Sequence, residues 1–385
     1  MFGFRQKKSS ERLEQKADSV RHLIAVQTNS GAVWTPRNYQ NLVREGYMRN
    51  AIVYRCVRMI CEAAASVPLR SRNPMLAKLL VEPTADQSGP DFFESLYGYL
   101  LLSGNGYLEM VSSNSLLELH VLRPDRMKVT VDKSGRPSGW EYAIGGWKVG
   151  LPRDFVQNRN PILHLKLFHP DNDHYGMSPL EAAACAVDIH NAGADWNKAM
   201  LDNAARPSGA LVFHSQVGDG LSDEQFDRLK AELEQSHQGA KNAGRPLLLE
   251  GGLDWKPMAL SPTDMDFLNC QHAAAREIAL AFGIPPMLLG IPGDNTYANY
   301  REANRAFWRQ TILPLVQKTA LGLENWMRAW IEPSVSIEVA RHLVPALQED
   351  QNSLWKRVTE ADFLNANEKR TLLGLDPVSS QGADK

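Results

Sequence analysis

A short segment, Asp171-Asn172-Asp173-His174, gathers residue types that bind metal ions and activate water. Acids at its first and third positions, with Gly176 at the sixth, match the start of a calcium-binding loop. However, Tyr175 stands where a third acid is needed and Ala182 where a glutamate is needed, so an EF-hand is excluded. The chemistry that stays open is a metal-dependent hydrolase or nuclease using Asp171, Asp173 and His174.

Other patterns in the sequence argue against an enzyme. His164, His169 and His174 are spaced by five residues, so they do not share one helix face, and we expect no metal site built from them. The 4 cysteines are scattered and form no CxxC pair, so neither a thiolate zinc site nor a disulfide framework is predicted. There is no GxxxxGK[ST] phosphate-binding loop, and Ser178 lacks the glycines of a nucleophile elbow. We therefore expect no catalytic residue, no cofactor and no metal.

The composition is that of an ordinary globular chain with balanced charge. Its 385 residues include 42 Lys and Arg and 44 Asp and Glu, which gives a formal net charge of −2. Proteins that grip nucleic acid over a large surface carry a basic excess, so such a clamp is disfavoured. The basic N-terminus has no apolar signal sequence, and no uncharged run is long enough to span a bilayer. We expect a soluble protein that is made in the cytoplasm and has no membrane partner.

Hydrophobic periodicity and breaker residues predict an α+β first part followed by long helices. The first part should contain helices over 47–67 and 91–103 and strands over 107–112, 117–122, 127–131, 139–144 and 161–168. A capping box at Ser178–Glu181 begins a long helix over 178–206. After it we expect a compact insert over 208–260, a helix over 262–282 ended by Gly283, a helix over 298–331 kinked at Pro314, and short helices within 353–373.

Five short strings occur in a distinctive order along this pattern. They are Gly104-Asn105-Gly106-Tyr107, His174-Tyr175-Gly176-Met177-Ser178-Pro179-Leu180, Glu277-Ile278-Ala279 with Phe282-Gly283-Ile284-Pro285-Pro286, Thr296-Tyr297-Ala298-Asn299, and Thr311-Ile312-Leu313-Pro314. Each string alone is weak. Together they resemble the portal, or head–tail connector, proteins of long-tailed double-stranded DNA phages, over about residues 40–345.

The resemblance implies a portal-type subunit that assembles into a dodecameric ring around an axial channel. The implied parts are a wing (28–177), a first stem helix (178–207), a clip (208–261), a second stem helix (262–284), a tunnel loop (285–297), a kinked helix returning to the wing (298–345) and a crown (346–376). Composition adds mobile ends at 1–27 and 377–385.

The function implied by the resemblance is structural. The ring would occupy one capsid vertex of the virion, where double-stranded DNA passes without sequence specificity during packaging and ejection. Its implied partners are further copies of itself, the terminase large subunit, the head–tail adaptor and the major capsid or scaffold protein. An active phage, a gene transfer agent and a defective prophage would all use such a ring, and the sequence does not separate them.

The composition of the implied tunnel loop suits a channel through which DNA slides. Each phosphate neutralised by Lys or Arg adds affinity, and this loop has no basic residue. The residues expected at the channel are Met287, Leu288, Leu289, Ile291, Asp294, Asn295 and Thr296. The alternative is a proline-rich connector packed inside one subunit.

Acidic residues recur every seven positions on the first long helix, so they lie near one face. Glu181 belongs to the capping box, which leaves Asp188, Asp195 and Asp202. They form either an acidic stripe toward the channel or a neighbouring subunit, or a solvated face with pairs such as Asp195 with Lys198 and Asp202 with Arg206. In the implied clip, Lys241, Asn242 and Arg245 either dock the motor or adaptor or lie in a mobile surface loop.

Overall fold

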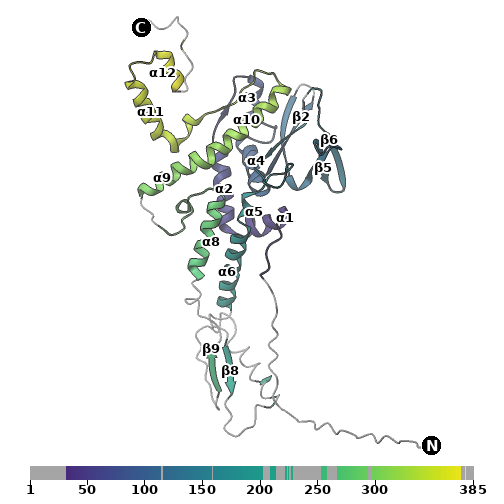
Figure 1. Cartoon of the computed structure of the whole chain (residues 1–385), viewed down its shortest axis with the longest axis vertical. Helices are drawn as coiled ribbons and strands as arrows, with labels where there is room; N and C mark the ends of the chain where they lie inside the picture. Colours follow the sequence, from purple (N-terminus) through teal and green to yellow (C-terminus); the bar gives the residue numbers. More distant parts are fainter. Residues whose placement is uncertain are drawn as a thin grey trace, which may run out of the picture. The chain divides into compact units, whose positions relative to one another are not determined.

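The computed structural model describes residues 32–113, 116–157, 159–202, 209–213, 222, 224, 227–228, 253–257, 267–293, 297–373 and 378. The chain divides into two compact units, Met1–Trp34 and Thr35–Lys385. The helices and strands labelled in Figure 1 belong to the second unit. The expected mobile ends at 1–27 and 377–385, Val378 excepted, lie outside the described residues.

Two packed helices, α2 (Ala51–Ala65) and α4 (Gly89–Ser103), lie in the main hydrophobic core. The buried residues of α2 repeat every three or four positions, which gives the helix one apolar face: Val53, Cys56, Val57, Ile60, Cys61 and Ala64. The side chain of Asn50 caps its first turn by accepting hydrogen bonds from the amides of Ile52 and Val53. Shorter helices, α1 (Tyr39–Leu42) with a π-helical turn (Val43–Tyr47) and α3 (Pro74–Val81), precede and follow α2.

Two antiparallel three-stranded sheets contain the strands of the first part. The main sheet has the order β3-β2-β7, with β2 (Asn105–Ser113), β3 (Leu116–Leu122) and β7 (Ile162–Lys166). The second sheet has the order β4-β5-β6, with β4 (Met127–Val131), β5 (Pro137–Ile144) and β6 (Trp147–Pro152). The periodicity predicted five of these strands but not β6, which follows a two-glycine turn at Gly145-Gly146 and is exposed along most of its length.

Two short strand pairs complete the described sheets. β1 (Leu69–Arg70) pairs with β10 (Glu338–Val339), which joins distant parts of the chain. β8 (Gly209–Phe213) pairs with β9 (Leu253–Pro257), and both strands lie in the insert expected over 208–260. Most of that insert lies outside the described residues.

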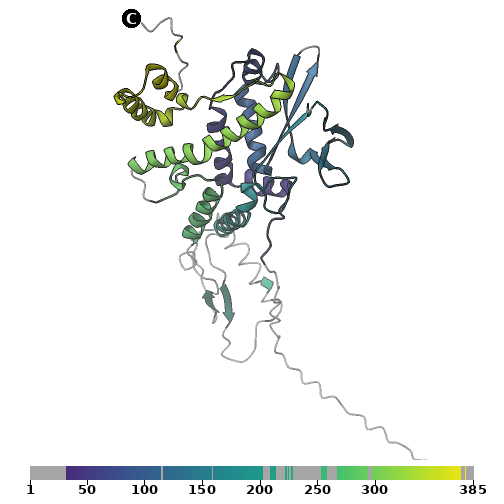
Figure 2. The same ribbon diagram turned by 45° about the horizontal axis from the view of Figure 1, so that its top comes forward.

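The predicted long helices are present in more pieces than expected. The helix from 178 divides at Ala183 into α5 (Pro179–Ala182) and α6 (Ala184–Asp202), and α8 (Phe267–Ala281) packs beside α6 in both views (Figures 1 and 2). The next helix consists of α9 (Tyr297–Phe307), a π-helical turn (Trp308–Ile312) and α10 (Leu313–Trp330). The last described helices are α11 (Gln348–Glu360) and α12 (Ala366–Leu372).

Two glycines bring the end of α4 against the segment that opens α5. Gly104 ends α4 with a φ of 76°, and a Cβ there would lie 2.5 Å from the carbonyl carbon of Gly176. A Cβ on Gly176 would lie 2.1 Å from the carbonyl oxygen of Gly104. Real Cβ atoms do not approach other atoms this closely, so neither position accepts a side chain without movement of the backbone.

Hydrogen bonds surround this glycine contact and join the same two strings. The side-chain oxygen of Asn105 accepts the amide of Gly176 at 2.8 Å and lies 2.9 Å from His164 Nε2. Ser178 Oγ accepts the amide of Leu180 at 2.9 Å, which caps α5, and donates to the carbonyl of Leu101 at 2.6 Å. The long helix therefore begins on a rigid attachment to α4 and the main sheet.

An alanine at Gly104 should destabilise the protein strongly. The left-handed backbone costs a residue with a Cβ about 1–2 kcal/mol, and the clash with Gly176 adds about 1–3 kcal/mol. Gly135 is a matched control because its φ is 80° but nothing lies within 4 Å of its Cβ position. Denaturant unfolding should show a loss of about 3 kcal/mol for Gly104→Ala and about 1 kcal/mol for Gly135→Ala. Equal losses would contradict the close contact.

His164 should make the protein less stable in mild acid. Its ring stacks on Tyr107 with centroids 4.2 Å apart, and burial, with a smaller effect of the Lys166 charge, lowers its pKa to about 3. A histidine whose folded pKa lies below its unfolded value of about 6.5 stabilises fully above that pH and progressively less as the pH falls. Between pH 7 and 5 the free energy of unfolding should fall by about 1 kcal/mol per pH unit below 6.5.

The variant His164→Gln keeps a donor for Asn105 and removes this titration. Denaturant unfolding at pH 7 and pH 5 should therefore differ less in the variant than in the native protein. Burial also lowers the pKa of His190, so a residual slope should persist in both proteins. Identical slopes in the two proteins would show that His164 is not held neutral.

Candidate functional site

One face of α6 is fixed to residues 35–50 of the same chain. The Asp188 carboxylate accepts hydrogen bonds from the amide and hydroxyl of Thr35, at 2.8 and 2.6 Å. The side-chain nitrogen of Asn191 donates to the carbonyl of Glu45 at 2.8 Å, and its side-chain oxygen accepts from the side-chain nitrogen of Asn50 at 2.9 Å. These positions and Asp195 lie three or four residues apart on the helix, so they share one face.

The three acids of the predicted stripe all have partners within the subunit. Arg49 Nη2 donates to both carboxylate oxygens of Asp195, at 2.7 and 2.6 Å, instead of the expected pairing with Lys198. Lys198 pairs with Asp202 at 2.7 Å, while Arg206 lies outside the described residues. Asp195 and Asp202 remain well exposed, so each ion pair contributes less than about 1 kcal/mol. The position of this face toward the channel or a neighbouring subunit stays a prediction.

The segment that follows α8 is anchored by a glycine and a threonine. Gly283, at a φ of 68°, ends the helix, and the amide of Ile284 donates to the carbonyl of Ala279 at 2.9 Å. Thr311, in the π-helical turn before α10, donates its hydroxyl to the carbonyl of Gly283 at 2.6 Å. The predicted stop at Gly283 is therefore confirmed, and it fixes α8 to the next long helix.

The predicted channel residues divide into buried and exposed groups. Pro286–Leu289 forms a 3₁₀ turn ended by Gly290 at a φ of 74°. Leu288 is only 9% exposed and Ile291 5% exposed within the subunit, although the resemblance implied that both lie at the channel, and their place in a ring stays a prediction. They pack inside the subunit, as the packed-connector alternative requires. Met287 and Leu289 are half-buried, whereas Asp294, Asn295 and Thr296 lie outside the described residues.

Arg276 of α8 is a functional candidate that the sequence analysis missed. Its guanidinium donates a hydrogen bond to the carbonyl of Pro292, so a cation lies against a segment that contains no basic residue. A cleft of about 480 Å³ adjoins this contact, with Arg276, Pro286, Met287, Ile291, Pro292 and Glu302 among its lining residues. Local composition gives no signal for this contact, because Arg276 precedes Pro292 by 16 residues.

Pro314 lies at the second residue of α10, directly after the π-helical turn. Proline has no amide hydrogen, so the regular helical hydrogen bonds cannot continue across it. The irregularity expected at Pro314 thus takes the form of a π turn on its N-terminal side, in which the amide of Leu313 donates to the carbonyl of Trp308.

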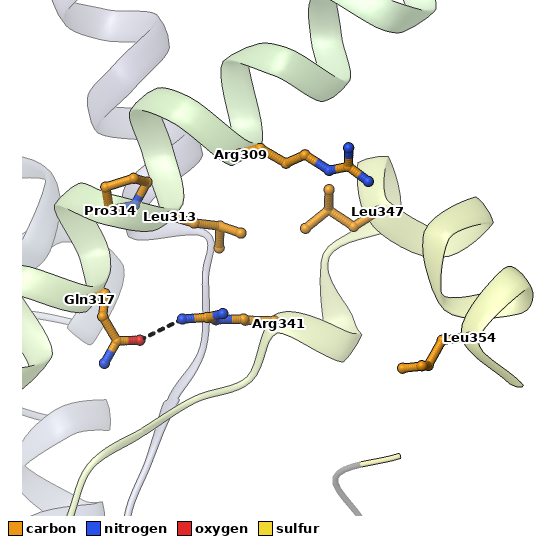
Figure 3. Close-up of a pocket in the computed structure, with 7 residues that line it drawn as sticks. All are labelled: Arg309, Leu313, Pro314, Gln317, Arg341, Leu347 and Leu354. Carbon is orange, nitrogen blue, oxygen red and sulfur yellow. Dashed lines mark hydrogen bonds between the residues drawn. The ribbon is translucent and has the colours of Figure 1, made fainter. Parts of the chain in front are cut away.

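The ring of Pro314 lines a cleft of about 570 Å³ between the long helix and the C-terminal segment (Figure 3). Arg309 and Arg341 reach across this cleft from opposite walls. Arg341 donates to the side-chain oxygen of Gln317 at 2.9 Å, and Leu313, Leu347 and Leu354 supply apolar walls.

The segment Asp171–His174 forms a turn with a structural role. The Asn172 side-chain oxygen accepts the amides of His174 and Tyr175, both at 2.9 Å, and the Tyr175 hydroxyl accepts the amide of Val129 at 2.9 Å. In the part of the chain that the structure describes, no three His, Cys, Asp or Glu side chains gather in a metal-binding arrangement. The geometry gives no support to the hydrolase or nuclease alternative.

Two further expectations concern the docking residues of the clip and the absence of a membrane partner. Lys241, Asn242 and Arg245 of the expected clip lie outside the described residues, so their docking role stays a prediction. Among the described helices, none is both long enough and apolar enough to cross a membrane.

The profile of a known family, described as "Phage portal protein", matches residues 51–374. The chain belongs to the phage portal protein family. The portal relatives include the portal protein of Enterobacteria phage HK97, which is 23% identical over 87% of this chain and 80% of that protein. An uncharacterised protein of Rickettsia bellii is 41% identical over 87% of this chain and 89% of that protein. Portal proteins are structural, so the family points to a protein that is not an enzyme.

Two solved structures resemble this portal chain over nearly its whole length. A chain in the virion of a native gene transfer agent particle is 51% identical, with a TM-score of 0.70, and the match covers 91% of this chain and 97% of that one. A chain in the neck of a native gene transfer agent particle, computed with C12 symmetry, is 50% identical, also with a TM-score of 0.70, and the match covers 90% and 96% of the two chains. The mixed helix-and-sheet fold is shared with a solved HK97-family phage portal protein from Corynebacterium diphtheriae, which is 13% identical, with a TM-score of 0.54, over 81% of this chain and 98% of that one.

Burial of Leu288 predicts a clear difference between two leucines of this region. Leu288→Ala should lower the free energy of unfolding by about 2–4 kcal/mol, because it leaves a cavity in the core. Leu280 on α8 is 78% exposed, so Leu280→Ala should change it by less than about 0.5 kcal/mol. Denaturant unfolding of both variants provides the measurement. A small effect at Leu288 would show that this side chain does not pack in the core and would favour the predicted position at the channel.

Proposed function

We propose that this chain forms the portal ring of a gene transfer agent or a closely similar phage-like particle. The observation that carries the proposal is the 51% identity to the gene transfer agent chain, over 91% of this chain and 97% of that one. The twelvefold symmetry of the similar neck structure supports a ring of twelve copies. The particle is thus the site of action, and DNA would pass through the ring during packaging and ejection.

The arrangement of elements supports the division into wing, stem, clip and crown. We assign the sheets with α2 and α4 to the wing, α5, α6 and α8 to the stem, β8 and β9 to the clip, and α11 and α12 to the crown. The hydrogen bonds from Thr35, Arg49 and Asn50 to α6 support a stem fixed rigidly to the wing. A rigid connection suits a ring that transmits load between a capsid and an external motor.

The partners follow from this position. We propose that the clip contacts the terminase large subunit during packaging and the head–tail adaptor afterwards, with Lys241, Asn242 and Arg245 as docking candidates. The wing and crown would contact the major capsid or scaffold protein. Asp188, Asp195 and Asp202 would lie toward the channel or the next subunit, with the charges of Asp195 and Asp202 offset by ion pairs inside the chain and Asp188 hydrogen-bonded to Thr35.

Part of the predicted tunnel loop is buried inside the subunit, so we propose that only its exposed part faces the channel. Leu288 and Ile291 form its base, whereas Gly290, Pro292 and Gly293 are exposed and uncharged. We propose that DNA meets this exposed part and Asp294, Asn295 and Thr296. An uncharged or acidic surface neutralises no phosphates, so it releases no counterions and adds little affinity for DNA.

Electron microscopy of the purified protein tests the ring. Twelve copies of the 43.0 kDa chain would give a particle of about 516 kDa with twelvefold averages. Replacing residues 294–296 by three lysines should leave these rings intact, because the buried base is unchanged, but should reduce DNA packaged into particles several-fold, because each added cation binds phosphate in every copy of the ring. Monomers or dimers at micromolar concentration would argue against a self-assembling ring. Normal DNA content in the lysine variant would argue against the tunnel loop.

A further inference from the structure

Arg276 lies at the point where the buried base of the predicted tunnel loop gives way to its exposed part. Its Nη2 donates to the carbonyl of Pro292 and lies 3.5 Å from the position that a Cβ on Gly293 would occupy. The guanidinium therefore covers the two residues that precede the predicted DNA-facing residues. Along the chain, Pro292 and Gly293 lie between α8, which carries Arg276, and α9, both of which are labelled in Figure 1.

The bond to Pro292 is the one polar contact of the Arg276 side chain within the described residues. Other arginines of the subunit pair with acids, as Arg49 does with Asp195 and Arg58 with Glu62. Arg276 is also exposed, whereas α8 packs through its buried residues Ala274, Ala275, Ile278 and Ala279. Helix packing therefore does not account for an arginine at this position.

Apolar contacts hold the segment only as far as Ile291. Leu288 and Ile291 are buried, but Pro292 and Gly293 are exposed and have no buried side chain to fix them. The adjoining cleft of about 480 Å³, lined also by Asn299, Glu302 and Ala303, leaves space into which these two residues could shift. Among the described contacts, the hydrogen bond from Arg276 is the directional one that ties Pro292 to α8.

We propose that Arg276 is a positioning residue that holds Pro292 and Gly293 against α8 and so sets where the exposed part of the loop begins. An arginine suits this task because its long side chain ends in a planar donor group that keeps its charge at all relevant pH values. The consequence for DNA passage rests on the proposed function of the loop, whereas the contact itself does not. A direct contact between Arg276 and DNA phosphates is the competing role that the test must separate.

Hydrogen exchange of the full-length protein, followed by mass spectrometry, measures the positioning directly. In Arg276→Ala, the peptide that covers 284–293 should exchange about tenfold faster, because a charge-assisted hydrogen bond is lost beside Gly293. Peptides from α8 should be unchanged. Arg136→Ala is the matched control, since Arg136 is an exposed arginine in the turn between β4 and β5. Unchanged exchange in an intact Arg276→Ala ring overturns the inference and leaves the portal function standing.

The variant Arg276→Lys separates positioning from phosphate contact. It keeps the charge but replaces the planar guanidinium by a flexible, strongly hydrated ammonium, so positioning predicts faster exchange and a lower DNA content of particles than in the native protein. A phosphate contact predicts instead native exchange in both variants and native DNA content in the lysine variant, which would overturn the inference. Faster exchange with normal DNA content would support Arg276 as the positioning residue and count against the proposed role of the loop.

Discussion

The backbone contact between Gly104 and Gly176 is the constraint on which the arrangement of the subunit depends. A helix end and the start of the next long helix approach so closely that no side chain fits between them. Asn105 and Ser178 make their hydrogen bonds across this contact, and the amide of Leu167 donates to the carbonyl of Gly104 at 2.8 Å. The direction of α5 and α6 relative to the main sheet therefore depends on the absence of a Cβ at Gly104 and Gly176 and on the hydrogen bonds around this contact.

The strings that carry the family resemblance meet in pairs in the folded chain, and this explains why they could be recognised. Gly104 and Asn105 contact Gly176, and Gly283 contacts Thr311, although each pair is far apart in sequence. Junctions of this kind need particular residues, because close approach or a positive φ admits few types. The elements between them need only the right hydrophobic period. The family, the fold class and most helices and strands could therefore be predicted from the sequence.

The environment of single side chains could not be predicted in the same way. An uncharged, proline-rich segment suits a channel wall and a packed connector equally, and the burial of Leu288 and Ile291 depends on how the rest of the subunit packs around them. Helical spacing likewise offers Asp195 only Lys198, whereas the actual partner, Arg49, is 146 residues away. Both features arise from tertiary contacts, which local patterns do not contain.

The near-equal numbers of acidic and basic residues are reflected in ion pairs inside the subunit. Ion pairs such as Asp195 with Arg49 and Asp202 with Lys198 are exposed and add little stability, but each removes an unpaired charge from the surface. In a ring, any net charge that faces the channel is repeated in every copy, so a small excess per subunit would either hold DNA or repel it. Arg276 differs because, within the described residues, it has no acidic partner and lies at the segment proposed to meet DNA. Its bond to a backbone carbonyl ties this charge to the base of the loop.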